Sequence, residues 1–396
     1  MAKKIPVVIA TGNIVSGVTS WAMELRRAFA GHPRYEILLL NYKGEKSGGF
    51  DLHASGPEEA ADLLHRASPL AFVPNYHWSL YMAGMDPRIR IVGICHADSA
   101  EEYYDPLAWY EPLISTFVAV SPECAAKLAG RIPARAGEIA VLPCAVVVPG
   151  TLQRDYRTSP VRLLHAGRIV QKQKRVMDFV PLAEGLCGRG VDYILDIAGE
   201  GPDLDRLKNG LAAMAAANRV RFLGRIDADA MPGLWRAHDI CVQLSDFEGT
   251  SVSMLEAMAQ GAVPVVTAAS SGIRDVLAHG RNGFVVPVGD MDAVADAIAR
   301  LAADRDALEA AGRAAHANAG RFSMDAYLPR FSAVLDRAFA ARARPWPFDR
   351  NPRKELLIRE LLARCSAGEL ARHVRLRTLL SAAAAGLRAK VSGRAR

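Results

Sequence analysis

The stretch that decides the fold covers residues 240–266 and has the sequence ICVQLSDFEGTSVSMLEAMAQGAVPVV. The apolar runs at its two ends have the length of buried strands. Between them, a Gly-containing turn leads into a helix for which Thr250 or Ser251 is a suitable N-cap. The helix ends at Gly261, and Pro264 follows. The stretch therefore predicts a strand–helix–strand unit with buried, parallel strands.

The same alternation of short apolar runs and longer amphipathic segments continues in both directions. It predicts a doubly wound α/β fold of two similar halves with a cleft between them. The predicted strands of the first half are Ile5–Ala10, Glu36–Leu40, Leu70–Val73, Ile89–Ile94, Phe117–Val120 and Ile139–Leu142. Those of the second half are Val161–Ala166, Tyr193–Ala198, Val220–Leu223, Ile240–Leu244, Val263–Thr267 and Gly283–Val286. Among the predicted helices are Ser20–Ala30, Pro57–Ala67, Asp203–Ala217 and Ser251–Gln260.

The segment Cys144–Arg157 has no helical period and contains Pro149-Gly150, so it is the expected interdomain linker. We therefore expect an N-terminal domain over residues 1–150 and a C-terminal domain over 151–322. A helix within 323–350 is expected to return to the N-terminal domain, and residues 351–396 form a basic, amphipathic tail.

Composition and charge restrict the class of protein. The chain has 396 residues, of which 51% are hydrophobic and 23% charged, as in a globular protein and not a disordered one. No run approaches the roughly 18 apolar residues of a membrane span, and the N-terminal apolar run is expected to be a buried strand and not a signal peptide. Six cysteines without a CxxC spacing are typical of free thiols in a reducing compartment, so we expect a cytoplasmic protein.

The positive charge is concentrated in the tail. Residues 351–396 hold eleven Lys/Arg and three acidic residues, a charge of +8, whereas the other 350 residues sum to −1. Basic and Leu-rich sequence of this kind favours peripheral contact with an anionic membrane surface, with an ordinary solvated helix or a disordered end as the equal alternative. The tail has no aromatic residue for base stacking, so we do not expect nucleic acid as a partner.

The helix start inside the decisive stretch is suited to an anion. Its first turn carries no acidic residue, so its N–H groups and positive dipole end are open. Glu248 precedes the helix and Glu256 lies inside it, roughly 12 Å away at helical rise. One carboxylate is placed to accept hydrogen bonds from sugar hydroxyls and the other from ribose hydroxyls, with a diphosphate between them.

This pattern resembles glycosyltransferase family 4. The resemblance covers Glu248 to Val266, SSGIRDV at 270–276 and NGFVV at 282–286, is specific over about 160–300 and is looser over 1–150. It implies the GT-B architecture of two facing Rossmann-like domains, with acceptor contacts on the N-terminal domain and the donor on the C-terminal one. It also implies sugar transfer with retention, without a metal or any cofactor besides the nucleotide-sugar substrate.

The resemblance assigns roles residue by residue. Glu248 would face the donor sugar, Glu256 the ribose, and the backbone of Gly249, Thr250 and Ser251 the diphosphate. The remaining assignments are Arg168 and Lys174 at the diphosphate, with Lys172 as the rival of Lys174; the main chain of Arg225 and Ile226 at the base; Gly17 near the donor phosphates; and His96 at the donor sugar.

The expected function is transfer of a sugar from a nucleoside-diphosphate sugar to an acceptor hydroxyl. The resemblance implies a glycan or lipid-linked acceptor, in synthesis of envelope or extracellular polysaccharide or of glycolipid. The alternatives are a nucleotide-sugar epimerase or a phosphorylase on the same architecture, and a non-enzymatic nucleotide-sugar-binding protein.

Overall fold

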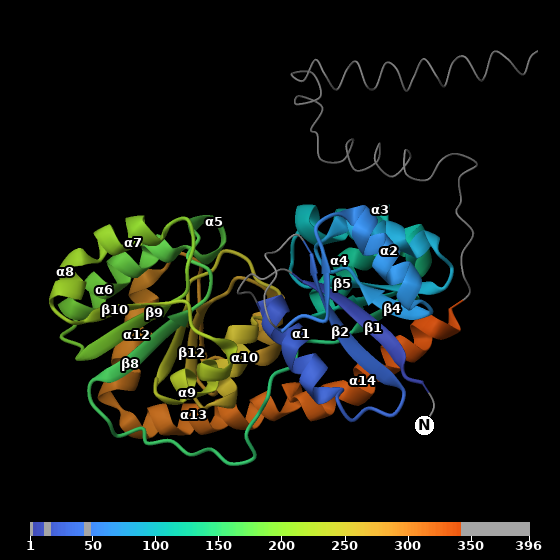
Figure 1. The fold of residues 1–396 in the computed structure, drawn as a ribbon. Helices are drawn as coiled ribbons and strands as arrows, with labels where there is room; N and C mark the ends of the chain where they lie inside the picture. Colours follow the sequence, from blue (N-terminus) through green and yellow to red (C-terminus); the bar gives the residue numbers. More distant parts are fainter. Residues whose placement is uncertain (1–2, 12–16, 43–48, 342–396) are drawn as a thin grey trace, which may run out of the picture.

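The computed structural model describes residues 3–11, 17–42 and 49–341, and these form two Rossmann-like α/β domains side by side (Figure 1). The basic tail predicted at 351–396 lies outside the described residues, as does the end of the segment 323–350. Among the residues described, no helix is both long and apolar enough to cross a membrane.

The described part of the N-terminal domain contains a seven-stranded parallel sheet. Its strand order is β3-β2-β1-β4-β5-β6-β7, so the winding direction reverses between β1 and β4. The strands are β1 (Ile5–Thr11), β2 (Tyr35–Tyr42), β3 (Leu52–Ala54), β4 (Leu70–Val73), β5 (Ile89–Cys95), β6 (Ile114–Ala119) and β7 (Ile139–Val141). The helical segments are α1 (Gly17–Ala28), α2 (Pro57–Ala67), η1 (Trp78–Met85), η2 (Ala100–Tyr104), α3 (Asp105–Trp109), η3 (Glu111–Leu113), α4 (Pro122–Arg131) and η4 (Pro133–Glu138).

The C-terminal domain contains a six-stranded parallel sheet in the order β10-β9-β8-β11-β12-β13, with the reversal between β8 and β11. Its strands are β8 (Val161–Ala166), β9 (Tyr193–Ala198), β10 (Val220–Gly224), β11 (Ile240–Gln243), β12 (Val263–Thr267) and β13 (Phe284–Val286). The helical segments are α5 (Gln171–Lys174), η5 (Val176–Asp178), α6 (Phe179–Gly188), α7 (Leu204–Gly210), α8 (Ala212–Ala216), η6 (Ala228–Ala230), α9 (Met231–Arg236), α10 (Val252–Ala259), α11 (Ser271–Val276), α12 (Met291–Ala303) and α13 (Arg305–Ala319).

The predicted doubly wound architecture is confirmed, and the strands lie where the apolar runs indicated. Two differences have local causes. The three-residue β3 is too short to produce a hydrophobic run, and the helix predicted over Asp203–Ala217 is broken at Leu211 into α7 and α8. Gly210 precedes this break and lies so close to the opposing helix that a Cβ there would be 2.8 Å from Val180 Cγ2.

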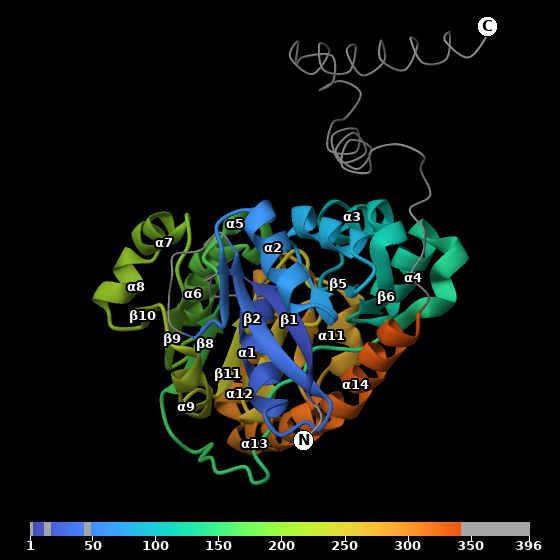
Figure 2. The ribbon, with the colours of Figure 1, turned by 45° about the vertical axis from the view of Figure 1, so that its right-hand side comes forward.

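The last helices connect the two domains. α13 packs against α10, η7 (Gly320–Phe322) follows, and α14 (Met324–Ala340) packs against α1 and the N-terminal sheet (Figures 1 and 2). The interdomain linker crosses at the same place, because Val146 N donates to Phe322 O at 3.0 Å and Met324 N donates to Val146 O at 3.0 Å. The two chain crossings are thus hydrogen-bonded to each other.

A continuous apolar cluster also spans the domain boundary. It includes Val120 and Cys124 on the N-terminal side and Val252, Leu255 and Met258 of α10 on the other. Burying each large aliphatic side chain contributes about 1.5–3 kcal/mol. The start of α10 is therefore held against the N-terminal domain and not only by its own sheet.

The linker is anchored by a buried arginine. The Arg154 guanidinium donates to Trp235 O and Gln260 O at 3.2 Å, to His238 O, and to Asp239 Oδ1 at 3.2 Å. These carbonyls lie at the ends of α9 and α10, which leave their last C=O groups without intrahelical partners. Arg154 and Asp239 are 2% and 3% exposed at their side chains, so the linker is part of the C-terminal core here.

Replacing Arg154 by leucine should lower the free energy of unfolding by about 3 kcal/mol, because it removes a buried cation paired with the Asp239 carboxylate and a donor to three main-chain carbonyl oxygens. Urea unfolding followed by circular dichroism measures the change. Arg157→Leu is the matched control, since its ion pair with Asp306 is exposed at 56% and 83%, and its loss should cost less than about 1 kcal/mol. Equal effects of the two substitutions would contradict the anchoring role of Arg154.

Candidate active site

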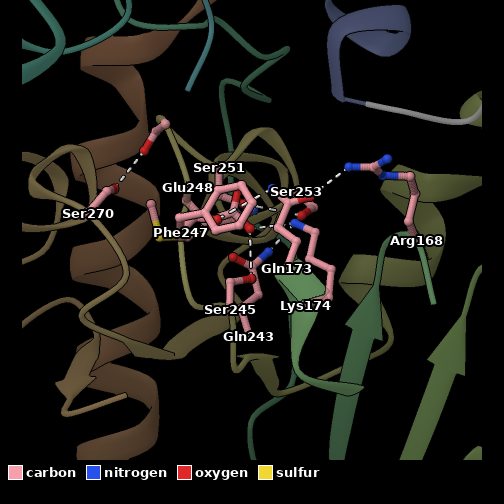
Figure 3. A network of polar contacts seen from close by, with 12 residues as sticks. Arg168, Gln173, Lys174, Gln243, Ser245, Phe247, Glu248, Ser251, Ser253 and Ser270 are labelled. Carbon is pink, nitrogen blue, oxygen red and sulfur yellow. Dashed lines mark hydrogen bonds and ion pairs between the residues drawn. The ribbon is translucent and has the colours of Figure 1, made fainter. Parts of the chain in front are cut away.

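The carboxyl ends of the strands at the two reversal points face each other across the domain boundary. In open α/β sheets this is where ligands bind. On the C-terminal side, the segment after β8 carries Arg168 and Lys174, and the segment after β11 carries Glu248. Figure 3 shows these side chains gathered in one polar network.

Glu248 is the centre of this network, with 7% of its surface exposed. Its Oε1 accepts a hydrogen bond from Ser245 Oγ at 2.7 Å and forms an ion pair with Lys174 Nζ. Lys174 is the last residue of the short helix α5, whereas Lys172 on the same helix is exposed. The structure thus brings Lys174 to the carboxylate and leaves Lys172 in solvent.

A second chain of contacts involves Gln173, which the sequence analysis did not identify. Arg168 is exposed, and its Nη2 donates to Gln173 Oε1 at 2.6 Å (Figure 3). Gln173 in turn donates from Nε2 to Phe247 O at 3.4 Å and accepts from Asp246 N at its own main-chain oxygen at 2.9 Å. Gln173 therefore fixes the loop after β8 against the loop after β11 and positions Arg168.

The start of α10 has the form expected of an anion site. Ser251, not Thr250, is the N-cap, because its Oγ accepts from Met254 N at 3.4 Å. The first turn contains no acidic residue, and Ser253 Oγ accepts from Gln243 Nε2 at 2.6 Å. The Thr250 hydroxyl has a different task, since it donates to Val120 O of the N-terminal domain at 3.0 Å.

The two domains touch at Gly249. Ala97 and Gly249 form an antiparallel bridge, and Asp98 N donates to Glu248 O at 3.4 Å. A Cβ at Gly249 would lie 2.0 Å from His96 O, so any side chain there would separate the loops. This close backbone approach is the physical reason for glycine between Glu248 and the helix start.

His96 follows β5, is 8% exposed, and has a defined tautomer. Asn75 Nδ2 donates to Ala10 O at 2.7 Å, so its Oδ1 is the acceptor for His96 Nε2 at 2.9 Å. Burial lowers the pKa of His96 to about 3, so the ring is neutral with its proton on Nε2. Nδ1 is therefore left as an acceptor. Asn75, which the sequence analysis did not identify, follows Pro74 after β4 and has a φ of 52°.

Glu256 lies half-buried on α10 on the side of the N-terminal helix α1. Burial raises the pKa of its carboxyl to about 7, the indole of Trp235 acts in the opposite direction, and the charge of Glu24 on α1 raises the pKa further. Glu248 precedes α10 and Glu256 lies within it, so the two carboxyl groups are in separate environments.

The remaining predicted site residues lie around this centre. Gly17 begins α1, and a Cβ there would be 3.2 Å from Val252 Cβ of α10. Arg225 and Ile226 follow the edge strand β10, two strands from β8, with Arg225 exposed. The structure therefore brings Gly17 to the helix start and places Arg225 and Ile226 at the outer side of the C-terminal sheet.

Within the described ranges, no group of three or more His, Cys, Asp and Glu side chains is arranged to hold a metal ion. A cavity of about 480 Å³ lies elsewhere, bordered by Met85, Ile89, Ile114 and Arg337. It opens where β5 and β6 begin, at the opposite end of these strands from His96, so it is separate from the polar network.

Comparison with known proteins finds its sequence matches in the C-terminal domain. Residues 155–318 match the family model of glycosyl transferases group 1. The matched range contains every residue of the polar network in Figure 3.

Curated relatives align over the same part of the chain. A lipopolysaccharide core biosynthesis glycosyltransferase, LpsE of Rhizobium meliloti, is 32% identical over 174 residues, which are 44% of this chain and 49% of that protein. A GDP-mannose-dependent alpha-(1-6)-phosphatidylinositol monomannoside mannosyltransferase of Mycobacterium tuberculosis is 36% identical over 129 residues, 30% of this chain and 33% of that protein. The chain spans less than half the length of these relatives.

Solved structures resemble the whole architecture. The structure of Anabaena Alr3699/HepE in complex with UDP-glucose has a TM-score of 0.67 and 17% identity, and the match covers 84% of this chain and 99% of that one. At this identity the likeness establishes the fold. The chain has the GT-B arrangement of two Rossmann-like domains.

The Glu256 carboxyl should make stability depend on pH. The folded protein keeps this proton up to about pH 7, whereas the unfolded chain releases it near 4.5. The contribution to stability is therefore complete below pH 4.5 and is lost as pH rises through about 7. Urea unfolding of the wild type and Glu256→Gln across this range measures it, and the wild type should lose stability relative to the variant. Glu24→Gln should shift the upper end of the window downward, and a constant difference across the range would refute the assignment.

Proposed function

We propose that the protein is a retaining, metal-independent glycosyltransferase of family 4 that transfers a hexosyl-type sugar from a nucleoside-diphosphate sugar to an acceptor hydroxyl. The observation that carries the proposal is the Lys174–Glu248 ion pair beside the acid-free start of α10. A cation and a helix start are suited to a diphosphate, and a buried carboxylate is suited to sugar hydroxyls. The group 1 family match over this segment supports it.

Donor binding would exchange the partners of this ion pair. The diphosphate takes the Lys174 ammonium and the N–H groups at the start of α10, with Arg168 turning from Gln173 toward a phosphate oxygen. Glu248 then accepts hydrogen bonds from the donor sugar, which His96 contacts from the N-terminal side. Glu256 accepts from the ribose, and the main chain of Arg225 and Ile226 borders the base. The Lys174 ammonium thus keeps an anionic partner, and the Glu248 carboxylate keeps hydrogen bonds from Ser245 and from the sugar hydroxyls in place of the ion pair.

The transfer step follows from the same placement. The acceptor hydroxyl attacks the anomeric carbon on the face that the diphosphate leaves, and the departing phosphate oxygen takes the acceptor proton. Lys174, Arg168 and the helix start stabilise the negative charge that develops on that phosphate. Glu248 is held between Ser245 and Lys174 and acts by positioning the sugar, not as a covalent nucleophile.

The acceptor is proposed to be a glycan or a lipid-linked glycan of envelope or extracellular polysaccharide or glycolipid synthesis. Relatives named for lipopolysaccharide core biosynthesis and for phosphatidylinositol mannoside mannosylation support this class. Measuring product release distinguishes this function from an epimerase or phosphorylase on this architecture and from a binding protein without activity. Only a transferase releases nucleoside diphosphate in proportion to added acceptor.

A panel of nucleotide sugars, assayed for nucleoside diphosphate release with and without glycan acceptors, tests the function. Acceptor-dependent release should occur, and Lys174→Ala should lower its rate about 100-fold because one cation at the leaving phosphate is lost. Lys172→Ala is the matched control on the same helix and should stay within about threefold of the wild type. Acceptor-independent release would contradict transfer, and a Lys172→Ala loss as large as that of Lys174→Ala would contradict the assigned cation.

We further propose that the basic residues of 351–396 place the protein on the cytoplasmic face of an anionic membrane, where lipid-linked acceptors lie. In flotation assays at low salt, the full chain should rise with phosphatidylglycerol-containing vesicles and remain behind with neutral vesicles. A chain ending at residue 350 should remain behind with both. Equal flotation of the two chains would refute the membrane role of the tail.

A further inference from the structure

A second buried histidine, His165, lies beside the Lys174–Glu248 pair. It is the penultimate residue of β8 and is 1% exposed. Its Nδ1 lies 3.1 Å from Val242 O, and its ring packs edge-on against Phe179 with the ring centres 4.9 Å apart. Since a carbonyl oxygen only accepts, Nδ1 carries the proton and Nε2 is an acceptor.

The Nε2 atom of His165 is buried without a hydrogen-bond partner among the described residues. Burial of the ring lowers the pKa of His165 to about 4, so Nε2 keeps its lone pair at neutral pH. A buried acceptor without a donor destabilises a fold. An apolar residue at this position would avoid that cost, so a partner in another state of the site explains the imidazole.

The Nε2 atom of His165 and the side chain of Lys174 border the same space. A methyl group on Gly167 would lie 3.8 Å from His165 Nε2 and 3.9 Å from Lys174 Cε, so the imidazole and the lysine side chain border the same small volume. The charges of Lys174 and Glu248 both act on the His165 ring, the first lowering its pKa and the second raising it. Lys174 is thus a hydrogen-bond donor whose side chain borders the same volume as the unpartnered Nε2 acceptor.

We propose that His165 is a positioning residue whose Nε2 accepts a hydrogen bond from the Lys174 ammonium when a donor diphosphate draws Lys174 away from Glu248. This inference rests on the proposed function. In the structure described here the ammonium pairs with Glu248. In the donor-bound state Glu248 turns to sugar hydroxyls, and the ammonium needs a second partner besides the phosphate.

A neutral acceptor suits that second position better than a carboxylate. An ammonium has three N–H donors, so it can bond a phosphate oxygen and an imidazole together. A carboxylate would cancel the positive charge that the diphosphate requires, whereas neutral imidazole leaves it intact. His165 would therefore direct Lys174 toward the leaving phosphate without weakening its field.

Two substitutions at His165 distinguish the role of Nδ1 from the role of Nε2. His165→Asn keeps an amide N–H at the position of Nδ1 for Val242 O but has no atom at the position of Nε2. His165→Gln extends an oxygen to the position of Nε2. Isothermal titration with UDP and GDP, and with uridine and guanosine as phosphate-free controls, measures the effect on the diphosphate alone.

His165→Asn should weaken binding of the preferred nucleoside diphosphate about tenfold, the size of one hydrogen bond to a charged group, and leave nucleoside binding unchanged. His165→Gln should recover affinity to within about threefold of the wild type. In a Lys174→Ala background, His165→Asn should have no further effect, because its only route to the diphosphate is then absent.

Other outcomes overturn the inference in distinguishable ways. If Lys174→Ala weakens diphosphate binding and His165→Asn does not, the proposed function stands and the role of His165 is wrong. If both His165 variants weaken nucleoside and nucleoside diphosphate binding alike, His165 is structural. If the wild type binds no nucleoside diphosphate when ADP, CDP and dTDP are tested besides UDP and GDP, the proposed function fails and the inference fails with it.

Discussion

The ion pair between Lys174 and Glu248 is the interaction on which the site depends. Both side chains are almost removed from water, at 14% and 9% exposure, so each is the main charged partner of the other in this structure. The pair also joins the loop after β8 to the loop after β11, across the point where the winding of the sheet reverses. Gln173 links the same two loops, because its side chain donates to Phe247 O and its main-chain oxygen accepts from Asp246 N. These contacts therefore fix the two loops relative to each other.

The N-terminal domain packs against the start of α10 and the loop that precedes it. Gly249 admits the backbone of His96, Thr250 donates to Val120 O, and the apolar face of α10 joins a cluster that continues into the other domain. The start of α10 is thus in contact with both domains. A helix whose dipole end is held by two domains presents its N–H groups at a fixed place, which is what recognition of a diphosphate requires.

Local signals in the sequence predicted the parts that depend on local structure. All strands but β3, an N-cap at Thr250 or Ser251, and the C′ residue Gly261, which has a φ of 74°, follow from hydrophobic runs and cap chemistry within about ten residues. Asn75, Gln173 and His165 could not be found in this way, because each matters through a partner far away in the chain or on a neighbouring strand. The choice between Lys172 and Lys174 likewise needed the three-dimensional position of Glu248. The break between α7 and α8 was missed because the close packing of Gly210 on Val180 has no signature in one sequence.

The protonation states of His96 and His165 determine how the site responds to a fall in pH. Each ring is a neutral acceptor, and the pKa values near 3 and 4 lie far below neutral pH. A fall of one pH unit in the cell would leave the charge of both rings unchanged. Glu256, with its pKa of about 7, would instead gain protons over that interval. On the proposed function, acidification would first change recognition of the nucleotide by Glu256, while the rings of His96 and His165 kept their protonation states.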